Sequence, residues 1–527
     1  MPIESTASRK RPAEETGVLP ATVRNVLSNW GGFAFSAIVN FLLAPFVVRH
    51  LGNSLYGISV LIMSLTGYLG LLDLGVRGAM IRYVAKFQSR SEHDEASRFT
   101  SAALVVFGAV GILAVSVSLA LAVWADSISV PGISPGWTRI LFVLGGLNVA
   151  ASLISGVFSG IPMALQRFEH VNAIAILSTI FRALLIVLAL STGGGLVALV
   201  CVQFVYTVAA TLASVWVSQR LYVQLRIRIG EIERRYVSLI LSFSAYSFSL
   251  TIFDTAVMYL NSVLLGAFQS ASLVTFFWIA ASLVNYSRTL VAGISKTSTP
   301  LASAMEARGD TRGLQRAMMN GASYATLVIL PIAATFALRG KSFIGLWMGP
   351  EYAELSGRVL WILTLGLAFS ASSQVALATM LGISKHRAVV PAFFVQALCI
   401  FAGSLVTVRP LGVVGVAWST TLPYLAVSLF FWPWYLRQSL QIPVRGFVFS
   451  AWVRPAMAGV PFALCTYAME KLWPAPNLVL FFLETGAILP TALVGYWYVY
   501  LTREHRQILA KTLLQPAWNT LRLRFWS

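Results

Sequence analysis

The stretch Arg49–Lys86, RHLGNSLYGISVLIMSLTGYLGLLDLGVRGAMIRYVAK, returns in altered form 218 residues later in the chain. A constant register shift relates matching residues over about 130 positions, which indicates an internal duplication. The pairs are Ser64/Ser282, Leu65/Leu283, Tyr68/Tyr286, Leu72/Leu290, Gly75/Gly293, Arg98/Arg316, Ser152/Ser370, Arg167/Lys385 and Gly194/Gly412. The sequence therefore predicts two similar halves followed by a remainder.

The composition predicts an all-α integral membrane protein. Of the 527 residues 57% are hydrophobic and only 11% are charged, and the mean hydropathy is +0.77. Apolar windows recur that are long enough to cross about 30 Å of hydrocarbon as helices. We place about fourteen transmembrane helices near residues 27–48, 55–75, 99–124, 137–163, 171–190, 194–218, 236–266, 272–294, 319–338, 356–381, 388–407, 411–436, 448–469 and 478–501.

The duplication and the spans predict a domain organisation. An even number of helices per half preserves orientation, so the halves are expected to be parallel repeats that enclose a central cavity. We predict a cytoplasmic tail (1–26), a six-helix lobe (27–220), a second six-helix lobe (221–438), two additional transmembrane helices (439–502) and a cytoplasmic tail (503–527). The polar first 26 residues contain no apolar core, so no cleavable signal peptide is expected.

The net charge of +19 is explained by topology. With a cytoplasmic N-terminus, about 28 of the 38 Lys and Arg residues fall in inner loops and tails and about 7 in outer loops, as the positive-inside rule requires. Three more, Arg182, Arg288 and Arg454, lie inside predicted spans. We therefore predict cytoplasmic termini and contact with anionic lipids, and we expect no nucleic acid partner.

Motifs for catalysis and for metal binding are absent from the sequence. No predicted loop exceeds about 25 residues, and the chain contains no phosphate-binding loop, nucleophile elbow or sugar-nucleotide motif. The three cysteines lie in apolar spans, and the five histidines form no paired spacing, so we expect no metal and no bound cofactor. Transport is a more economical prediction than an enzyme.

Polar residues at bilayer depth are costly and therefore informative. Asp254 lies near the middle of the seventh span, and a register shift of 214 places Asn40 at the same depth of the first span. Each forms either a hydrogen bond between helices or part of a cavity or cation site. Glu484, about six residues inside the last span, is expected to reach the outer interface.

The arginines in the spans have two interpretations each. Arg288 replaces Gly70 of the first half and either extends to the cytoplasmic interface or lines the cavity. Arg182, in the middle of the fifth span, requires a carboxylate, backbone carbonyls or an anionic ligand. Asp73, Arg77 and Arg82 lie where the second span meets the cytoplasm, as a candidate cytoplasmic gate or a local ion pair.

Several stretches together resemble the Wzx-type polysaccharide flippases of the multidrug/oligosaccharidyl-lipid/polysaccharide exporter (MOP) superfamily. They are RHLGNSLYG, SLTGYLGLLDLGV with IRYVAK, and the outer-loop run IGLWMGPEY. The resemblance covers the first twelve helices. It implies a fold like that of multidrug (MATE) transporters and a bacterial inner-membrane protein that flips undecaprenyl-diphosphate-linked oligosaccharide for surface polysaccharide, including exopolysaccharide, by alternating access.

The resemblance also implies partners and site residues. The partners are the lipid-linked oligosaccharide, membrane lipids and, as candidates, polysaccharide polymerase or export proteins. Cavity arginines would attract the anionic cargo, which assigns substrate binding to Arg288, Arg182 and Asn40. Some relatives hold sodium among the seventh, eleventh and twelfth helices, where this chain has Asp254, Gln396, Thr420 and Thr421. Sodium or proton coupling through these residues is the corresponding expectation.

Two other functions remain as alternatives. An ion-coupled multidrug or organic-cation antiporter of the same fold would need acidic residues in the first lobe, where the deep charge is Arg182. A membrane glycosyltransferase or polymer ligase would need a substantial outer loop with catalytic residues, and the longest outer loops here are short.

Overall fold

The computed structural model of the chain describes residues 15–70, 76–124, 134–228, 233–295, 297–385 and 387–500. These residues form helices and no strands, and ten helices among them are long and apolar enough to cross a membrane. Each of the predicted spans overlaps a helix of the structure. The prediction of an all-α multi-pass membrane protein is therefore confirmed.

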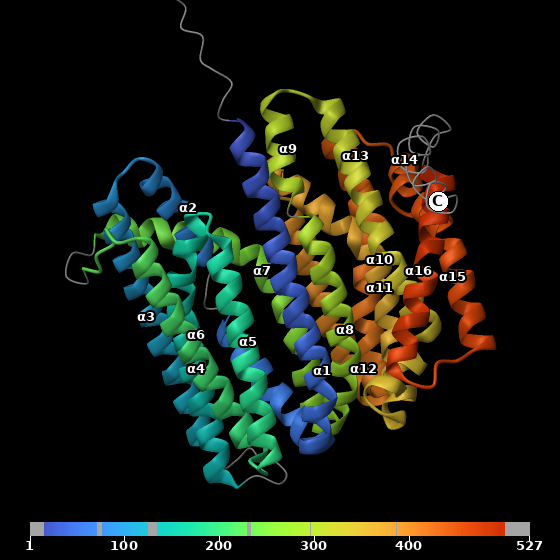
Figure 1. Cartoon of the computed structure of the whole chain (residues 1–527), viewed down its shortest axis with the longest axis horizontal. Helices are drawn as coiled ribbons and strands as arrows, with labels where there is room; N and C mark the ends of the chain where they lie inside the picture. The colour runs from blue at the N-terminus through green and yellow to red at the C-terminus, as the bar shows by residue number, and fades with distance from the viewer. Residues whose placement is uncertain are drawn as a thin grey trace, which may run out of the picture. The chain divides into compact units, whose positions relative to one another are not determined.

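The chain divides into two compact units, Met1–Thr255 and Ala256–Ser527, whose boundary lies within α7 (Arg234–Phe268). In the first unit α5 packs against both α1 and α6, and α4 lies between α3 and α6 (Figure 1). The helices that lie wholly in it are α1 (Glu15–Gly70), α2 (Val76–Ser89), α3 (His93–Val123), α4 (Pro135–Ala164), α5 (Phe168–Ser191) and α6 (Gly195–Leu221). The predicted lobe boundary near residue 220 stays a prediction.

In the second unit α10 packs against both α11 and α15, and α15 packs against α16. Two π-helical turns, Val427–Phe431 and Phe449–Val453, precede α13 and α15. The helices are α8 (Ala271–Ser295), α9 (Ser298–Ala307), α10 (Thr311–Trp347), α11 (Pro350–Gly382), α12 (Val389–Ala426), α13 (Trp432–Leu440), α14 (Val444–Val448), α15 (Arg454–Leu472) and α16 (Leu478–Tyr500).

The backbone repeats with the register shift found in the sequence. Adding 218 to the first residue of α3 gives 311, where α10 begins, and adding 218 to the last residues of α2 and α4 gives the ends of α9 and α11. Left-handed residues repeat as well. Ser91 (φ 58°) corresponds to Gly309 (φ 68°), and Gln166 (φ 57°) to Ser384 (φ 54°). These helix ends and left-handed residues therefore occupy equivalent positions in the two halves.

Two helices each contain a pair of predicted spans, joined across a single non-helical glycine instead of a loop. Gly52 (φ 75°, ψ 165°) interrupts α1, and Gly412 (φ 55°, ψ −135°) interrupts α12. A residue with a Cβ atom is strained in this part of backbone space, whereas glycine enters it freely. The glycines therefore allow the chain to end one span and begin the next without a connecting loop.

The connection between the halves is attached to α3. The backbone N–H of Arg226 donates to Ser97 Oγ at 3.1 Å, and that of Arg228 donates to Ser101 Oγ at 2.8 Å. Because Ser97 and Ser101 are one helical turn apart, the extended connection runs along one face of α3.

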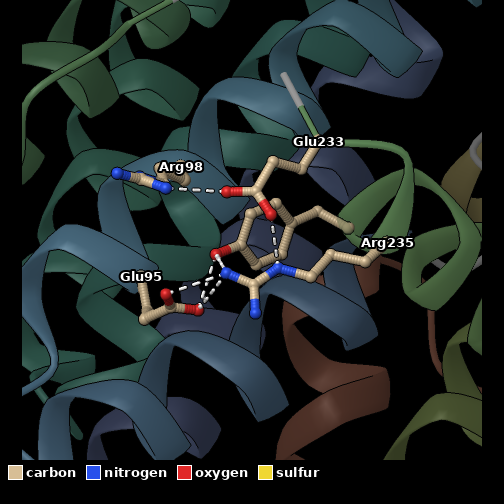
Figure 2. A network of polar contacts seen from close by, with 5 residues as sticks. Glu95, Arg98, Glu233 and Arg235 are labelled. Atoms are coloured by element: carbon tan, nitrogen blue, oxygen red, sulfur yellow. Dashed lines mark hydrogen bonds and ion pairs between the residues drawn. The ribbon is translucent and has the colours of Figure 1, made fainter. Parts of the chain in front are cut away.

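Charged side chains extend this attachment to the start of α7 (Figure 2). Arg98 of α3 pairs with Glu233 at 2.7 Å, and Arg235 of α7 pairs with Glu233 at 2.6 Å and with Glu95 of α3 at 2.9 Å. The hydrogen bond from Arg98 holds the pKa of the Glu233 carboxyl below its usual range. The first turn of α7 is therefore fixed to the first unit.

Replacing Gly412 with alanine should destabilise the protein by roughly 1–2 kcal/mol, because alanine at φ 55° is strained. Nothing lies within 4 Å of a Cβ atom built there, so a clash does not contribute. The control is Gly108→Ala inside α3, which also has open space around its Cβ position and an ordinary helical backbone. That variant should be neutral or more stable. Thermal unfolding of the purified variants in detergent makes the comparison, and equal stabilities would contradict the strain argument.

Candidate functional site

Arg182 is the deepest charge of α5 in the first unit. It lies 9 residues before the end of the helix and 14 after its start, which corresponds to about 13 Å and 21 Å along the axis. The guanidinium donates from Nη2 to Asn40 Oδ1 of α1 and from Nη1 to Gln203 Oε1 of α6 at 3.5 Å. Its Cζ atom lies 5.5 Å from the ring centroid of Tyr206. The structure thus brings together Arg182 and Asn40, two residues to which the sequence assigned substrate binding.

The partners that the structure describes for Arg182 do not compensate its charge. Asn40 and Gln203 are neutral amides, and the Tyr206 ring supplies only the weak attraction of its face. Among the side chains that the structure describes, no carboxylate pairs with Arg182. A second bond, from Asn40 Nδ2 to the Ser36 carbonyl at 2.7 Å, fixes the amide so that its oxygen faces the guanidinium. The cluster is a preoriented cation at bilayer depth.

The second unit contains a related pair. The Arg288 Cζ atom of α8 lies 5.0 Å from the ring centroid of Tyr424 of α12, and Nη1 donates to the Tyr424 hydroxyl at 3.4 Å. The register shift of 218 carries Tyr206 onto Tyr424, so equivalent tyrosines of the two halves each face an arginine. The arginines themselves come from non-equivalent helices, α5 and α8. Sequence reasoning found the arginines but missed the tyrosines, although the duplication pairs them.

Three of the four candidate ion-coupling residues have buried side chains, and one of them is hydrogen-bonded to a buried amide. Gln396, Thr420 and Thr421 of α12 are all less than 10% exposed. The sequence did not single out Asn261 of α7, which donates to Thr420 Oγ1 at 2.9 Å. Thr421 donates instead to the Ile362 carbonyl at 3.2 Å. The side chain of Asp254 lies outside the described residues. Metal-binding side chains do not gather in groups of three within the described part of the chain.

The candidate gate is described only in part, because Asp73 lies outside the described residues. Arg77 of α2 passes over Gly156 of α4, with Nη2 3.6 Å from the position a Cβ atom would take there. Arg82 packs against the neighbouring Tyr83, with 5.8 Å between Cζ and the ring centroid. A gating role for these residues stays a prediction.

An ion cluster at Arg339 was missed by sequence reasoning. Its side chain is fully buried and contacts Glu470 of α15 at 2.8 Å and Glu484 of α16 at 2.6 Å. The sequence placed Arg339 just outside a span ending at residue 338, whereas α10 continues to Trp347. The sequence did not predict that Glu484 pairs with this arginine, and its side chain is 12% exposed; its position relative to the outer interface stays a prediction.

The comparisons place the chain among polysaccharide biosynthesis proteins. The family described as "Polysaccharide biosynthesis protein" matches residues 22–306, more than half of the chain. A curated relative, the putative O-antigen transporter of Shigella flexneri, is 21% identical over 374 residues, which span 69% of this chain and 86% of the relative. The uncharacterised membrane protein EpsK of Bacillus subtilis (strain 168) is 20% identical over 343 residues, 63% of this chain and 66% of its own length.

Solved structures share the fold. An inward-facing multidrug resistance MATE family transporter of the MOP superfamily matches with a TM-score of 0.65 and 15% identity, covering 77% of this chain and 94% of that chain. The lipid II flippase MurJ in its inward closed conformation matches with a TM-score of 0.64 and 13% identity, covering 91% and 99%. The resemblance inferred from the motifs is thereby confirmed, and the chain belongs to the polysaccharide biosynthesis protein family, on the fold of the MOP superfamily.

Proposed function

We propose that the protein is a flippase, and not an enzyme, that moves undecaprenyl-diphosphate-linked oligosaccharide repeat units across the bacterial inner membrane for surface polysaccharide biosynthesis. Membership of the polysaccharide biosynthesis family and the name of a curated relative, a putative O-antigen transporter, support this function, and the chain shares its fold with a lipid II flippase. The proposal includes cytoplasmic termini, which the charge asymmetry of the loops predicts. It also includes alternating access, for which two parallel repeats around a cavity are suited.

The observation that carries the proposal is the uncompensated charge of Arg182. A guanidinium at bilayer depth is costly unless an anion neutralises it, and its described partners here are all neutral. A cargo diphosphate offers oxygens that accept charge-assisted hydrogen bonds in the fork geometry of arginine. Bound cargo would therefore supply the missing negative charge, while its prenyl chain stays in lipid.

Arg288 of the second unit is the other arginine that we propose to bind anionic cargo. Its guanidinium stacks on Tyr424, so the tyrosine limits the directions in which the arginine can donate. Each unit then has one arginine held against an equivalent tyrosine and able to bind an anionic group. An organic-cation antiporter gains no support from this arrangement, because positive side chains repel cationic cargo.

Coupling to a sodium or proton gradient through Asp254, Gln396, Thr420 and Thr421 is a further part of the proposal. The buried hydroxyls and amides of α7 and α12 are neutral oxygen donors of the type that hard cations prefer. Membrane lipids surround the protein, and polysaccharide polymerase or export proteins are the partners to which flipped cargo would pass.

Substituting Asn40 with aspartate should strongly impair transport without unfolding the protein. The new carboxylate would lie against Arg182 and neutralise it, so the guanidinium would no longer attract an anionic cargo. We expect cargo flipping in proteoliposomes to fall at least tenfold, about 1.4 kcal/mol, while thermal stability is kept or raised.

The matched control is Asn40→Ser, which keeps a neutral oxygen and should retain most of the transport. Full transport by the Asn40→Asp protein would show that Arg182 has only a structural role.

The two tyrosines should respond differently to loss of the hydroxyl. Tyr424→Phe removes an acceptor of Arg288 and should lower transport roughly threefold to tenfold. Tyr206→Phe keeps the face that Arg182 contacts and should stay close to the parent. Tyr206→Leu and Tyr424→Leu, which remove the ring, should both impair transport in the same assay. Normal transport by both leucine variants would mean that the arginine–tyrosine pairs do not act on cargo.

A further inference from the structure

A buried ion cluster in the second unit is distinct from the candidate substrate residues and the candidate ion-coupling residues. Arg339 of α10 donates from Nε to Glu470 Oε2 of α15 at 2.8 Å and from Nη2 to Glu484 Oε2 of α16 at 2.6 Å. The Ser342 hydroxyl, one turn further along α10, donates to the other oxygen of Glu470. Three helices therefore meet at one guanidinium and two carboxylates.

The surroundings of this cluster are apolar. The Arg339 side chain is 0% exposed, and the side chains of Glu470 and Glu484 are 19% and 12% exposed. The Phe481 ring covers the guanidinium, with 4.4 Å between its centroid and Cζ, and it stacks on Phe343 with 5.1 Å between centroids. Solvent therefore screens these charges weakly, so an uncompensated charge here raises the free energy of the folded protein.

The charges do not balance. Two carboxylates share one guanidinium, which leaves one negative charge when both are ionised. The other nearby lysine and arginine side chains on α10, α11 and α15 are not bonded to these carboxylates in the described structure. Lys341 of α10 pairs with Glu354 of α11, which also pairs with Arg358 at 3.3 Å, and Lys471 of α15 is exposed. Within the described residues, Arg339 is the one cation bonded to Glu470 and Glu484.

Two buried polar atoms, one of Arg339 and one on α15, have no hydrogen-bond partner among the described residues. One is Arg339 Nη1. The other is Thr466 Oγ1, on a side chain that is 2% exposed and four residues before Glu470 on α15. Residues four apart share a helix face, so the Thr466 hydroxyl lies on the face of α15 that carries Glu470. A buried hydroxyl without a described partner, on the helix face that carries a surplus carboxylate, is a candidate oxygen ligand.

We propose that Glu470, Glu484 and Thr466, beside Arg339, form a binding site for one sodium ion. One added positive charge brings the cluster to neutrality. Carboxylate and hydroxyl oxygens are ligands of the type that hard cations such as sodium prefer. The slight exposure of both carboxylates gives the ion a route to the cluster. The bound cation would stabilise the attachment of α15 and α16 to α10.

Thermal unfolding of the full chain in detergent tests this site without any cargo, so its outcome is independent of the flippase proposal. The Asp254→Asn background removes the candidate coupling carboxylate from the measurement. Sodium chloride replaces choline chloride at constant pH and ionic strength. A sodium site predicts that the midpoint of unfolding rises by at least about 2 °C.

In the same background, Glu484→Gln and Glu470→Gln should each remove most of this response, because either leaves one carboxylate for one guanidinium. The matched control is Glu354→Gln, which alters an exposed carboxylate of the neighbouring helix and should keep the response. The parent's failure to respond to sodium would overturn the proposal. A full response in either glutamine variant that folds would also overturn it.

Discussion

A charged group inside a membrane protein must find compensation, and the organisation of this molecule follows from how each deep arginine does so. Arg339 binds two carboxylates, and Arg454 donates to the carbonyls of Val499 and Tyr500 near the end of α16. Both arginines join helices of the second unit. Arg182 is different because it is oriented by neutral amides and a tyrosine ring. Arg339 and Arg454 thus bond to oxygen acceptors of the second unit, whereas the described partners of Arg182 are neutral, which is why we propose that an anionic cargo binds there.

The two halves of the chain share a duplicated backbone frame but carry their candidate substrate-binding arginines on non-equivalent helices. The two halves share helix ends, left-handed turns and equivalent tyrosines at positions 206 and 424. Onto this common frame each half adds its own arginine, Arg182 from α5 and Arg288 from α8. Equivalent tyrosines that each meet an arginine from a different helix provide similar chemistry in both units without identical residues.

Hydropathy and the repeat were sufficient to predict the helical class and the positions of the spans. The pairing of Asn40 with Arg182 could not be predicted, because it depends on the packing of α1 against α5, which no local pattern encodes. Arg339 was missed because the apolar pattern fades near residue 338 although the helix continues to Trp347. Hydropathy finds the apolar part of a helix, and buried ion clusters near helix ends fall outside that signal.

The central claim is that the Arg182 guanidinium binds the negatively charged headgroup of the lipid-linked cargo. Its most direct test is the affinity of the purified protein for undecaprenyl diphosphate compared with uncharged undecaprenol, in the parent and in an Arg182→Leu protein. The account predicts that the parent binds the diphosphate at least tenfold more tightly than the alcohol and that Arg182→Leu loses most of this preference, about 1.4 kcal/mol or more. A preference for the diphosphate that is unchanged in Arg182→Leu would contradict the account.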